Sequence, residues 1–234
     1  MIESTCHDHL GRPSYPVAEA GRLVGLTEGR VRRWLRGYEY RYGDAVRGQP
    51  PVVQGGGTQS SYASFLDLVD LLFVKRFLDH GVSLQRVRRA LDEARRLLGT
   101  DHFARQTFFT DGGAIFLRLQ EGAAGDRGDA ILELMSGGQW VIAPVIRELA
   151  QQIEFGSPEG LAKRWYPLGR DRPVVLDPMV AYGAPSIAGR GVKTTNIHDL
   201  FIAEDESLAS VRAWWELSDD EIRAAVDFER QLAA

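Results

Sequence analysis

Cysteine is almost absent from this chain of 234 residues, and the one present, Cys6, cannot form an internal disulfide bond. This scarcity suits a reducing compartment, so we expect a cytoplasmic protein. No apolar run approaches the roughly 18 residues that cross a bilayer. The polar N-terminus, residues 1–12, also lacks the basic and apolar regions of a signal peptide. These absences argue against a membrane-embedded or exported protein.

Motifs for catalysis are equally scarce. The run 189–195 resembles a phosphate loop, but Val192 separates its glycines from Lys193, whereas a P-loop needs a contiguous Gly-Lys-Ser/Thr. The segment 6–9, Cys-His-Asp-His, has metal-type ligands but no distant partner pair at zinc spacing. No serine or cysteine lies in a nucleophile motif. The sequence therefore predicts a protein that is not an enzyme and has no metal or other cofactor.

Charge is modest overall but unevenly distributed. The net charge is −4, yet residues 1–105 contain 16 Lys and Arg against 12 Asp and Glu, and residues 106–234 contain 12 against 20. Residues 22–47 alone contain seven arginines and three acids. A basic front and an acidic back are expected if the two halves bind different partners.

Residues 15–36 have the pattern of two short helices joined by a tight turn. An apolar stripe of Ala18, Ala20, Leu23 and Val24 marks the first helix. Gly25 can adopt the positive φ of the turn, and Thr27 can cap the second helix.

In the second helix, Val31, Trp34 and Leu35 recur at helical spacing and should face inward, while the arginines project outward. A helix-turn-helix places the start of its second helix in the major groove, so Glu28, Arg30 and Arg33 are the base-contact candidates. A solvated arginine face that touches no nucleic acid is the alternative, and spacing alone does not decide between them.

Residues 37–61 predict a hairpin or wing with a flexible tip, because glycines and prolines alternate there with tyrosines. A helix that is apolar nearly all round follows at residues 65–78 and predicts burial on several sides. Residues 84–98 predict an amphipathic helix whose arginine face is either solvated or, less commonly, a phosphate clamp.

This order of elements resembles the winged helix-turn-helix of the MerR family over residues 15–99, including the phrase DHGVSLQRVRRAL at residues 79–91. The resemblance implies that the second helix and the wing contact DNA. MerR regulators continue into a long dimerising helix, whereas Gly99, Thr100 and Asp101 end the helical pattern here. The predicted DNA contacts are Thr27, Glu28, Arg30, Arg32, Arg33, Arg36, Arg41 and Arg47.

The rest of the chain predicts two further units. Residues 106–172 should contain a β-hairpin around 111–113, a helix over VIAPVIRELAQQIEF and a strand in KRWYPLG. Residues 173–234 should form three short helices behind a strand and a loop, with caps at Ser207 and at the Ser218–Glu221 capping box. We therefore expect an α+β protein, mainly α with small β elements. Its predicted parts are a tail (1–14), the winged helix-turn-helix (15–105), a connecting unit (106–172) and a small helical domain (173–234).

Residues 175–229 are similar to a small helical domain found in many bacterial antitoxin-like proteins. The positions that carry this similarity are Asp177, Pro178, Gly183, Pro185, Ile187, Gly189, Ser218, Glu221, Ala224 and Ala225. With its head, the chain resembles a VapB-type antitoxin of a type II toxin-antitoxin system. The resemblance implies a VapC-like PIN-domain ribonuclease as partner, whose acidic, Mg²⁺-dependent site an arginine could plug.

Arg190, Lys193 and Arg212 are the candidates for that contact with the toxin. Trp214 and Trp215 are adjacent on a helix and point about 100° apart, so both cannot enter one narrow core stripe. They belong either to a partner interface or to a broad inter-domain core.

Operator DNA is the second expected partner, and a homodimer is expected because two half-sites favour a two-fold protein. The helix 65–78 has apolar surface to spare for such a dimer. The main alternative is a stand-alone MerR-like transcriptional regulator with a sensor in residues 106–234. A further alternative is a pure interaction module whose head no longer binds DNA.

Overall fold

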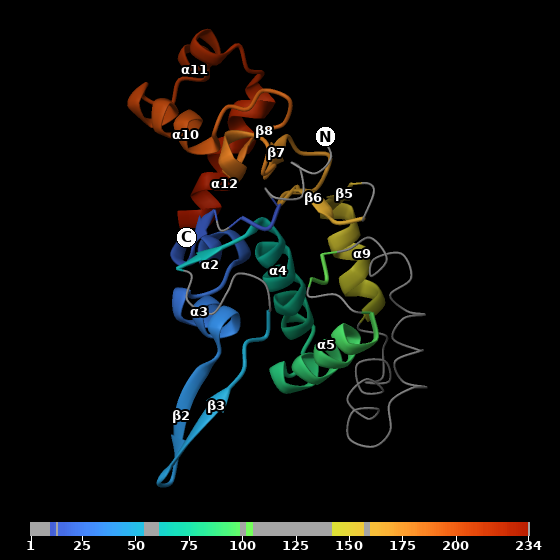
Figure 1. Cartoon of the computed structure of the whole chain (residues 1–234). Coiled ribbons are helices and arrows are strands. Elements are labelled where there is room, and N and C mark those ends of the chain that lie inside the picture. The colour runs from blue at the N-terminus through green and yellow to red at the C-terminus, as the bar shows by residue number, and fades with distance from the viewer. Residues whose placement is uncertain are drawn as a thin grey trace. The chain divides into compact units, whose positions relative to one another are not determined.

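The computed structural model describes residues 10–12, 14–53, 61–98, 102–104, 142–156 and 160–233 (Figure 1). The chain divides into two compact units. Residues 11–150 and 155–162 form the head unit, and residues 151–154 with the chain from 163 onward form the C-terminal unit. The mainly α fold with small β elements is confirmed. The four-part division into 1–14, 15–105, 106–172 and 173–234 stays a prediction.

Two helices and a glycine turn open the head unit. Helix α2 (Val17–Val24) ends at Gly25, which is left-handed with φ 68°, and helix α3 (Glu28–Arg36) follows. The amide of Leu26 donates to the Gly21 carbonyl at 2.8 Å, so the turn folds back on α2. The predicted apolar stripe of α2 is correct for Ala20, Leu23 and Val24, but Ala18 is exposed and Val17 is buried in its place.

A short strand pair and a hairpin surround these helices. Strand β1 (Tyr15–Pro16) pairs antiparallel with β4 (Tyr62–Ala63). Strand β2 (Tyr38–Tyr42) pairs antiparallel with β3 (Ala45–Gln49), and this hairpin, the wing, projects beyond α3 as a free ribbon (Figure 1). The wing turns at Gly43, whose φ of 61° suits a two-residue loop. The glycine run 55–57 lies outside the described residues.

The core of the head unit is built on α4 (Phe65–Asp79), beside α5 (Leu84–Leu98). A capping box starts α4: the Asp67 amide donates to Ser64 Oγ at 3.1 Å, and the Ser64 amide donates to Asp67 Oδ2 at 2.8 Å. Every apolar residue of α4 except the half-buried Leu78 is buried, as the sequence predicts. Two acids of this helix, Asp67 and Asp70, are buried with them.

Helix α9 (Ile142–Gln152) is shorter than predicted. Its last three expected residues form strand β5 (Ile153–Phe155), which pairs with β6 (Ala162–Trp165) in the predicted strand KRWYPLG. Pro144 lies in the first turn of α9, where its missing N–H is tolerated. The hairpin predicted around 111–113 lies outside the described residues.

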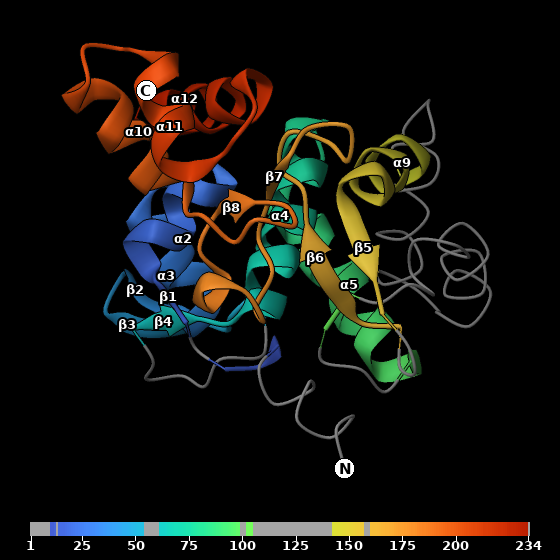
Figure 2. The same cartoon turned by 90° about the horizontal axis from the view of Figure 1, so that it is seen from above.

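The C-terminal unit ends in three helices behind a small strand pair. Strand β7 (Val174–Val175) pairs antiparallel with β8 (Ser186–Ile187), and the 3-10 turn η1 (Ala181–Gly183) lies between them. Helices α10 (Thr194–Ala203), α11 (Leu208–Trp215) and α12 (Asp219–Ala233) follow and lie together (Figure 2). Both predicted caps form, since Ser207 Oγ accepts from the Ser210 amide and Ser218 Oγ from the Glu221 amide.

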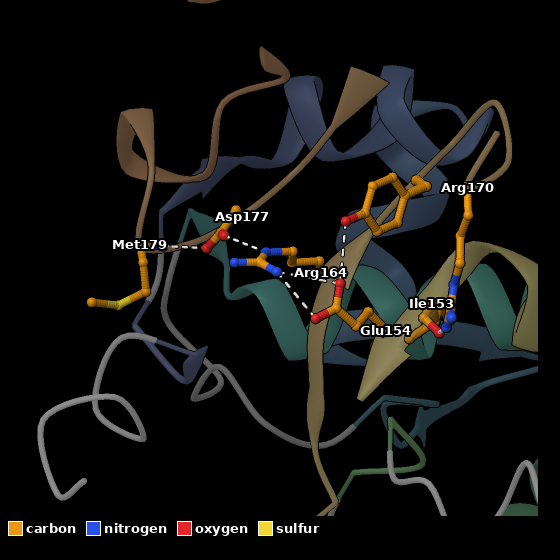
Figure 3. A network of polar contacts seen from close by, with 7 residues as sticks. Ile153, Glu154, Arg164, Arg170, Asp177 and Met179 are labelled. Carbon is orange, nitrogen blue, oxygen red and sulfur yellow. Dashed lines mark hydrogen bonds and ion pairs between the residues drawn. The ribbon is translucent and has the colours of Figure 1, made fainter. Parts of the chain in front are cut away.

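A charged network joins the first strands of the C-terminal unit to its β7–η1 connection (Figure 3). The Arg164 guanidinium donates to Asp177 Oδ2 at 2.6 Å and to Glu154 Oε1 at 3.1 Å. Tyr166 Oη also donates to Glu154, at 3.2 Å. Asp177 is buried, and its hydrogen bond and charge raise the already high pKa of Arg164. Across all the described ranges, no helix combines the length and apolarity that crossing a membrane requires.

Candidate nucleic-acid interface

Helix α3 is anchored by two residues and exposes the rest. Val31 is 0% exposed and Trp34 3%, while Arg30, Arg32 and Arg33 are exposed. Three arginines on the solvent side of a helix that follows a tight turn give the charge and placement that a DNA-reading helix needs. Arg30 has no ion pair within the described residues, so its guanidinium is available to a phosphate or a base edge.

Two of the predicted contact residues engage each other instead. The Arg32 guanidinium donates to the Glu28 carboxylate one turn earlier, in an exposed pair that neutralises both charges. Thr27 occupies the N-cap, but its side chain makes no capping hydrogen bond, contrary to the expectation from sequence. Its carbonyl instead accepts from the amides of Arg30 and Val31 at 2.9 and 3.0 Å.

The two faces of the wing differ in chemistry. Residues paired across an antiparallel ladder share a face, so the pairing of Tyr40 with Arg47 and of Arg41 with Val46 places the two arginines on opposite faces. The face of Arg47 also carries Tyr38, Tyr40 and Tyr42, and we call it the tyrosine face. Arg47 lies over the Tyr42 ring at 4.8 Å.

The tyrosine face adjoins α3, because the guanidinium of Arg33 lies 5.9 Å from the ring centroid of Tyr38. Arg33, the tyrosines and Arg47 therefore form one continuous surface. Arg41 lies on the other face of the wing, and Arg36 is half-buried and donates to Ser61 Oγ at 3.3 Å. The eight predicted contacts thus do not lie on one surface. The surface through Arg33 and Arg47 is the one that combines α3 with the wing.

The arginines of α5 divide in a way that periodicity does not reveal. Arg86 and Arg89 are exposed, whereas Arg88 is 8% exposed and its guanidinium donates to the Pro50 carbonyl. Arg95 donates in the same way to the Val52 carbonyl. Arg88 and Arg95 therefore contact protein backbone at the base of the wing, which is neither a solvated face nor a phosphate clamp.

Sequence reasoning also missed a buried polar cluster in the head unit. Asp70 Oδ1 accepts from the amides of Phe103 and Ala104 at 2.9 and 3.0 Å, and Asp70 Oδ2 lies 2.8 Å from His102 Nδ1. Burial raises the pKa of Asp70, against the opposing effects of His102 and the amide of Phe103. The signal was an acid inside an apolar helix, which requires a buried partner.

The C-terminal unit holds the predicted partner contacts. Arg190 lies 3.5 Å from Glu221, and Arg212 lies 3.4 Å from Asp219, so both carry a carboxylate partner already. Lys193 is the half-buried N-cap residue of α10.

The two tryptophans of α11 are open to solvent, as Arg190 and Arg212 also are. Trp214 is 72% exposed and Trp215 37%, whereas Val211 is the buried residue of the helix. In the parts of the chain that the structure describes, no group of three or more His, Cys, Asp or Glu could hold a metal ion. The segment 6–9 lies outside those parts.

Two helices across a glycine turn, an arginine-bearing second helix and a two-stranded wing define a winged helix-turn-helix head. In agreement, residues 13–91 match the family described as "Putative DNA-binding HTH domain". The helix-turn-helix prediction is confirmed, while the contacts of individual residues stay predictions.

Known proteins resemble the chain well beyond this head. A Mycobacterium tuberculosis protein named "Putative antitoxin VapB45" is 28% identical over 92% of this chain and 93% of its own. The resemblance to a VapB-type antitoxin with a helix-turn-helix head is therefore confirmed. The crystal structure of Rv2018 from M. tuberculosis has the same fold, with a TM-score of 0.69, 24% identity and coverage of 92% of this chain and 98% of that one.

A second kind of relative shares a smaller part. An uncharacterised HTH-type transcriptional regulator of Mycobacterium bovis, Mb1861, is 34% identical over 143 residues, which are 59% of this chain and 57% of that protein. The match thus spans little more than half of the regulator's own length. These relatives are named as an antitoxin and as a transcriptional regulator, and not as enzymes.

Proposed function

We propose that this protein is an antitoxin that binds and neutralises a VapC-like PIN-domain ribonuclease and represses its own operon by binding operator DNA. The observation that carries the proposal is the likeness to a named antitoxin over nearly the whole of both chains. Such a protein acts by binding and needs no catalysis or cofactor of its own. Its place would be the cytoplasm, where operator DNA and the RNA cleaved by the toxin are found.

The head unit supplies the DNA-binding half of the proposal. Arg30 and Arg33 on α3 and Arg47 on the tyrosine face would contact the operator, with Arg30 and Arg33 nearest the bases. The exposed pair of Glu28 and Arg32 contributes little net charge there, and Arg41 would lie away from the duplex. Thr27 and Arg36 would contact DNA only at the ends of α3.

The C-terminal unit supplies the toxin-binding half, centred on α11. A helix with one fully buried residue and an exposed Trp214 leaves a large aromatic surface uncovered, and such residues are typical anchors of protein interfaces. Acidic residues without an ion pair among the described residues flank both ends of α11. They are Glu204, Asp205, Glu216 and Asp220. A ribonuclease must bind polyanionic RNA through a basic surface, which such an acidic rim complements.

An arginine that plugs the toxin's acidic site is the second part of this contact. Arg190 and Arg212 would have to exchange Glu221 and Asp219 for the carboxylates of the toxin. Arg190 and Arg212 are exposed, whereas Glu221 and Asp219 are half-buried, so the exchange would leave these two carboxylates without their present partners. Lys193 is less accessible at the start of α10.

A homodimer on a two-fold operator completes the proposal. The apolar surface of α4 does not support the dimer as expected, because its residues are buried within the head unit itself. The dimer therefore rests on the symmetry of operators and on the winged helix-turn-helix fold.

Co-expression with the product of the neighbouring reading frame tests the proposal. We expect a stable co-purified complex, relief of growth arrest, and loss of both in Trp214→Ala. The matched control is Tyr62→Ala, since Tyr62 is 48% exposed on the head unit and should leave the complex intact. Absence of a complex together with unrelieved toxicity would contradict the antitoxin function.

A stand-alone MerR-like regulator with a C-terminal sensor is the second candidate, favoured by the relative named as a transcriptional regulator. It predicts operator binding that changes with a small effector and needs no toxin. Titrating the purified chain with its own upstream DNA, with and without the neighbouring protein, separates the two functions.

A further inference from the structure

The wing is exposed along most of its length, and Arg33 contacts it at Tyr38, near its start. All of β2 is exposed, and in β3 only Gln49 is half-buried. Its direction must therefore be fixed where it joins the head unit, at Gly37 and at residues 50–53, which we call the wing base. The amides of Val52 and Val53 donate to the Trp34 carbonyl at 2.7 and 3.1 Å, so α3 holds one side of the wing base.

The entry to the wing is equally constrained. Gly37 has φ 73°, and a Cβ atom there would lie 2.4 Å from the Gln49 carbonyl oxygen. Only glycine permits this close approach of the two limbs of the wing. The limbs are thus pressed together at their base, and a contact made to one limb also constrains the other.

Helix α5 holds the other side of the wing base through two arginines, the buried Arg88 and the half-buried Arg95. Arg88 donates to the Pro50 carbonyl and Arg95, two turns later, to the Val52 carbonyl. Burial lowers the pKa of Arg88, while Tyr38 and Asp92 act in the opposite direction. A guanidinium taken out of water to reach a backbone carbonyl forms a strong, directional bond. These two arginines therefore determine where the wing base lies relative to α5.

Arg95 also ties the wing base to the segment that follows α5. Its guanidinium lies 5.0 Å from the ring centroid of Phe103 and 2.9 Å from Asp92 Oδ1. The amide of Phe103 is held in turn by the buried Asp70 of α4. One arginine side chain thus touches both the wing base and the first described residues after α5.

We propose that Arg88 and Arg95 are positioning residues that set the wing for DNA without touching DNA. The proposal rests on the proposed DNA-binding function of the head unit. In this arrangement the wing is correctly placed only while α5 and residues 102–104 hold their positions. Operator affinity then depends on a part of the chain that lies outside the DNA-binding surface.

A double-mutant cycle tests this role, with the full chain and a duplex of its own upstream region as probe. Arg47→Ala reports the wing contact and Arg30→Ala the helix contact. We expect Arg95→Met to weaken binding about tenfold. The loss should disappear when Arg47 is already Ala, because the position of the wing no longer affects affinity once its contact with DNA has been removed. It should persist in full beside Arg30→Ala.

The controls separate positioning from other roles. Arg89→Met removes an exposed arginine of the same helix. Any loss of affinity that it causes should be the same whether residue 47 is Arg or Ala. Arg88→Met acts through Pro50 and provides a second variant if Arg95→Met fails to fold. In the free protein, hydrogen exchange at Val52 and Val53 should accelerate in Arg95→Met and stay unchanged in Arg89→Met.

Two results would overturn the inference. Equal losses from Arg95→Met in both backgrounds would mean that the arginine contacts DNA or merely stabilises the head unit. Unchanged exchange at Val52 and Val53 would mean that it does not hold the wing base. If the unmutated chain fails to bind the duplex, the proposed function fails instead, which is a separate outcome.

Discussion

Helices α3 and α11 are both sparsely anchored, yet they expose opposite kinds of surface. α3 buries Val31 and Trp34 and presents arginines, whereas α11 buries Val211 and presents two tryptophans between acidic ends. A helix is kept folded by its buried face, so its exposed face is free to be selected for a partner. The comparison is consistent with the proposed partners, a polyanion for α3 and a protein for α11.

The largest expected effect on this comparison comes from replacing a buried tryptophan and an exposed tryptophan by alanine in two separate variants. Trp34→Ala should destabilise the head unit by about 3–5 kcal/mol, because it opens a cavity in a closed core. Trp214→Ala truncates an equally large side chain that is mostly exposed, and should change the free energy of unfolding by about 0.5 kcal/mol or less. Urea denaturation, followed by hydrogen exchange of α2–α4 and of α10–α12, measures both. Equal destabilisation by the two variants would contradict the assigned burial.

The DNA surface offers the next largest effect. Arg30→Ala and Arg33→Ala should each weaken operator binding by about 1–3 kcal/mol if the side chains read bases. Arg47→Ala should lower affinity for all sequences alike and reduce the salt dependence by about one phosphate contact. Arg41→Ala, on the opposite face of the wing, is the matched control. Fluorescence anisotropy across a salt series checks these values, and a loss from Arg41→Ala equal to that from Arg47→Ala would refute the assignment of the faces.

Helix caps sharpen the comparison further, because only one of two similar residues bonds through its side chain. Ser218→Ala should cost the C-terminal unit about 1 kcal/mol, since Ser218 Oγ accepts from the Glu221 amide. Thr27→Ala should cost the head unit only about 0.3 kcal/mol, because the Thr27 side chain makes no capping bond. Thermal unfolding of both variants measures the two costs. A larger cost at Thr27 would show that its hydroxyl does cap α3.

The smallest expected effect is a difference in pH dependence between the units. Burial raises the pKa of Asp70 above 3.8, so its contribution favours folding below that value and is lost as pH rises through the folded pKa. Although burial opposes it, Ser218 and Arg190 lower the pKa of Glu221 below 4.5, so its contribution is present above 4.5 and is lost on acidification. Carbon-detected NMR titration of the two carboxyl groups, with Asp70→Asn and Glu221→Gln as references, gives the two signs. If the pKa values of Asp70 and Glu221 shifted in the same direction, the assigned surroundings of one of the two carboxyl groups would be wrong.

Local patterns predicted much of this fold. Gly25 and the spacing of Val31 and Trp34 were sufficient for the α2–turn–α3 unit, and the Ser218–Glu221 pattern for the start of α12. Each of these features is decided by contacts within one turn of helix. A sequence pattern contains that information directly.

What the sequence did not predict depends on distant pairing. The partners of Asp70 lie more than 30 residues away, and those of Arg88 and Arg95 lie on another element. The alternation YEYRY predicts that Arg41 lies opposite the tyrosines. Placing Arg47 with them, however, requires the register of β3, which only the paired strands define. The sequence therefore yields a list of candidate site residues, but not the surfaces on which the structure places them.

The network of Glu154, Arg164 and Asp177 has a practical consequence for dissecting the protein. A fragment that begins at Pro173 would retain the buried Asp177 and lose the guanidinium that compensates its charge. A fragment that begins at Gln151 retains all three side chains and the bond from the Tyr166 amide to the Gln152 carbonyl. Anyone who isolates the C-terminal helices to capture a partner should start the chain at the earlier residue, because the later start would expose an unpaired acid and not the native surface.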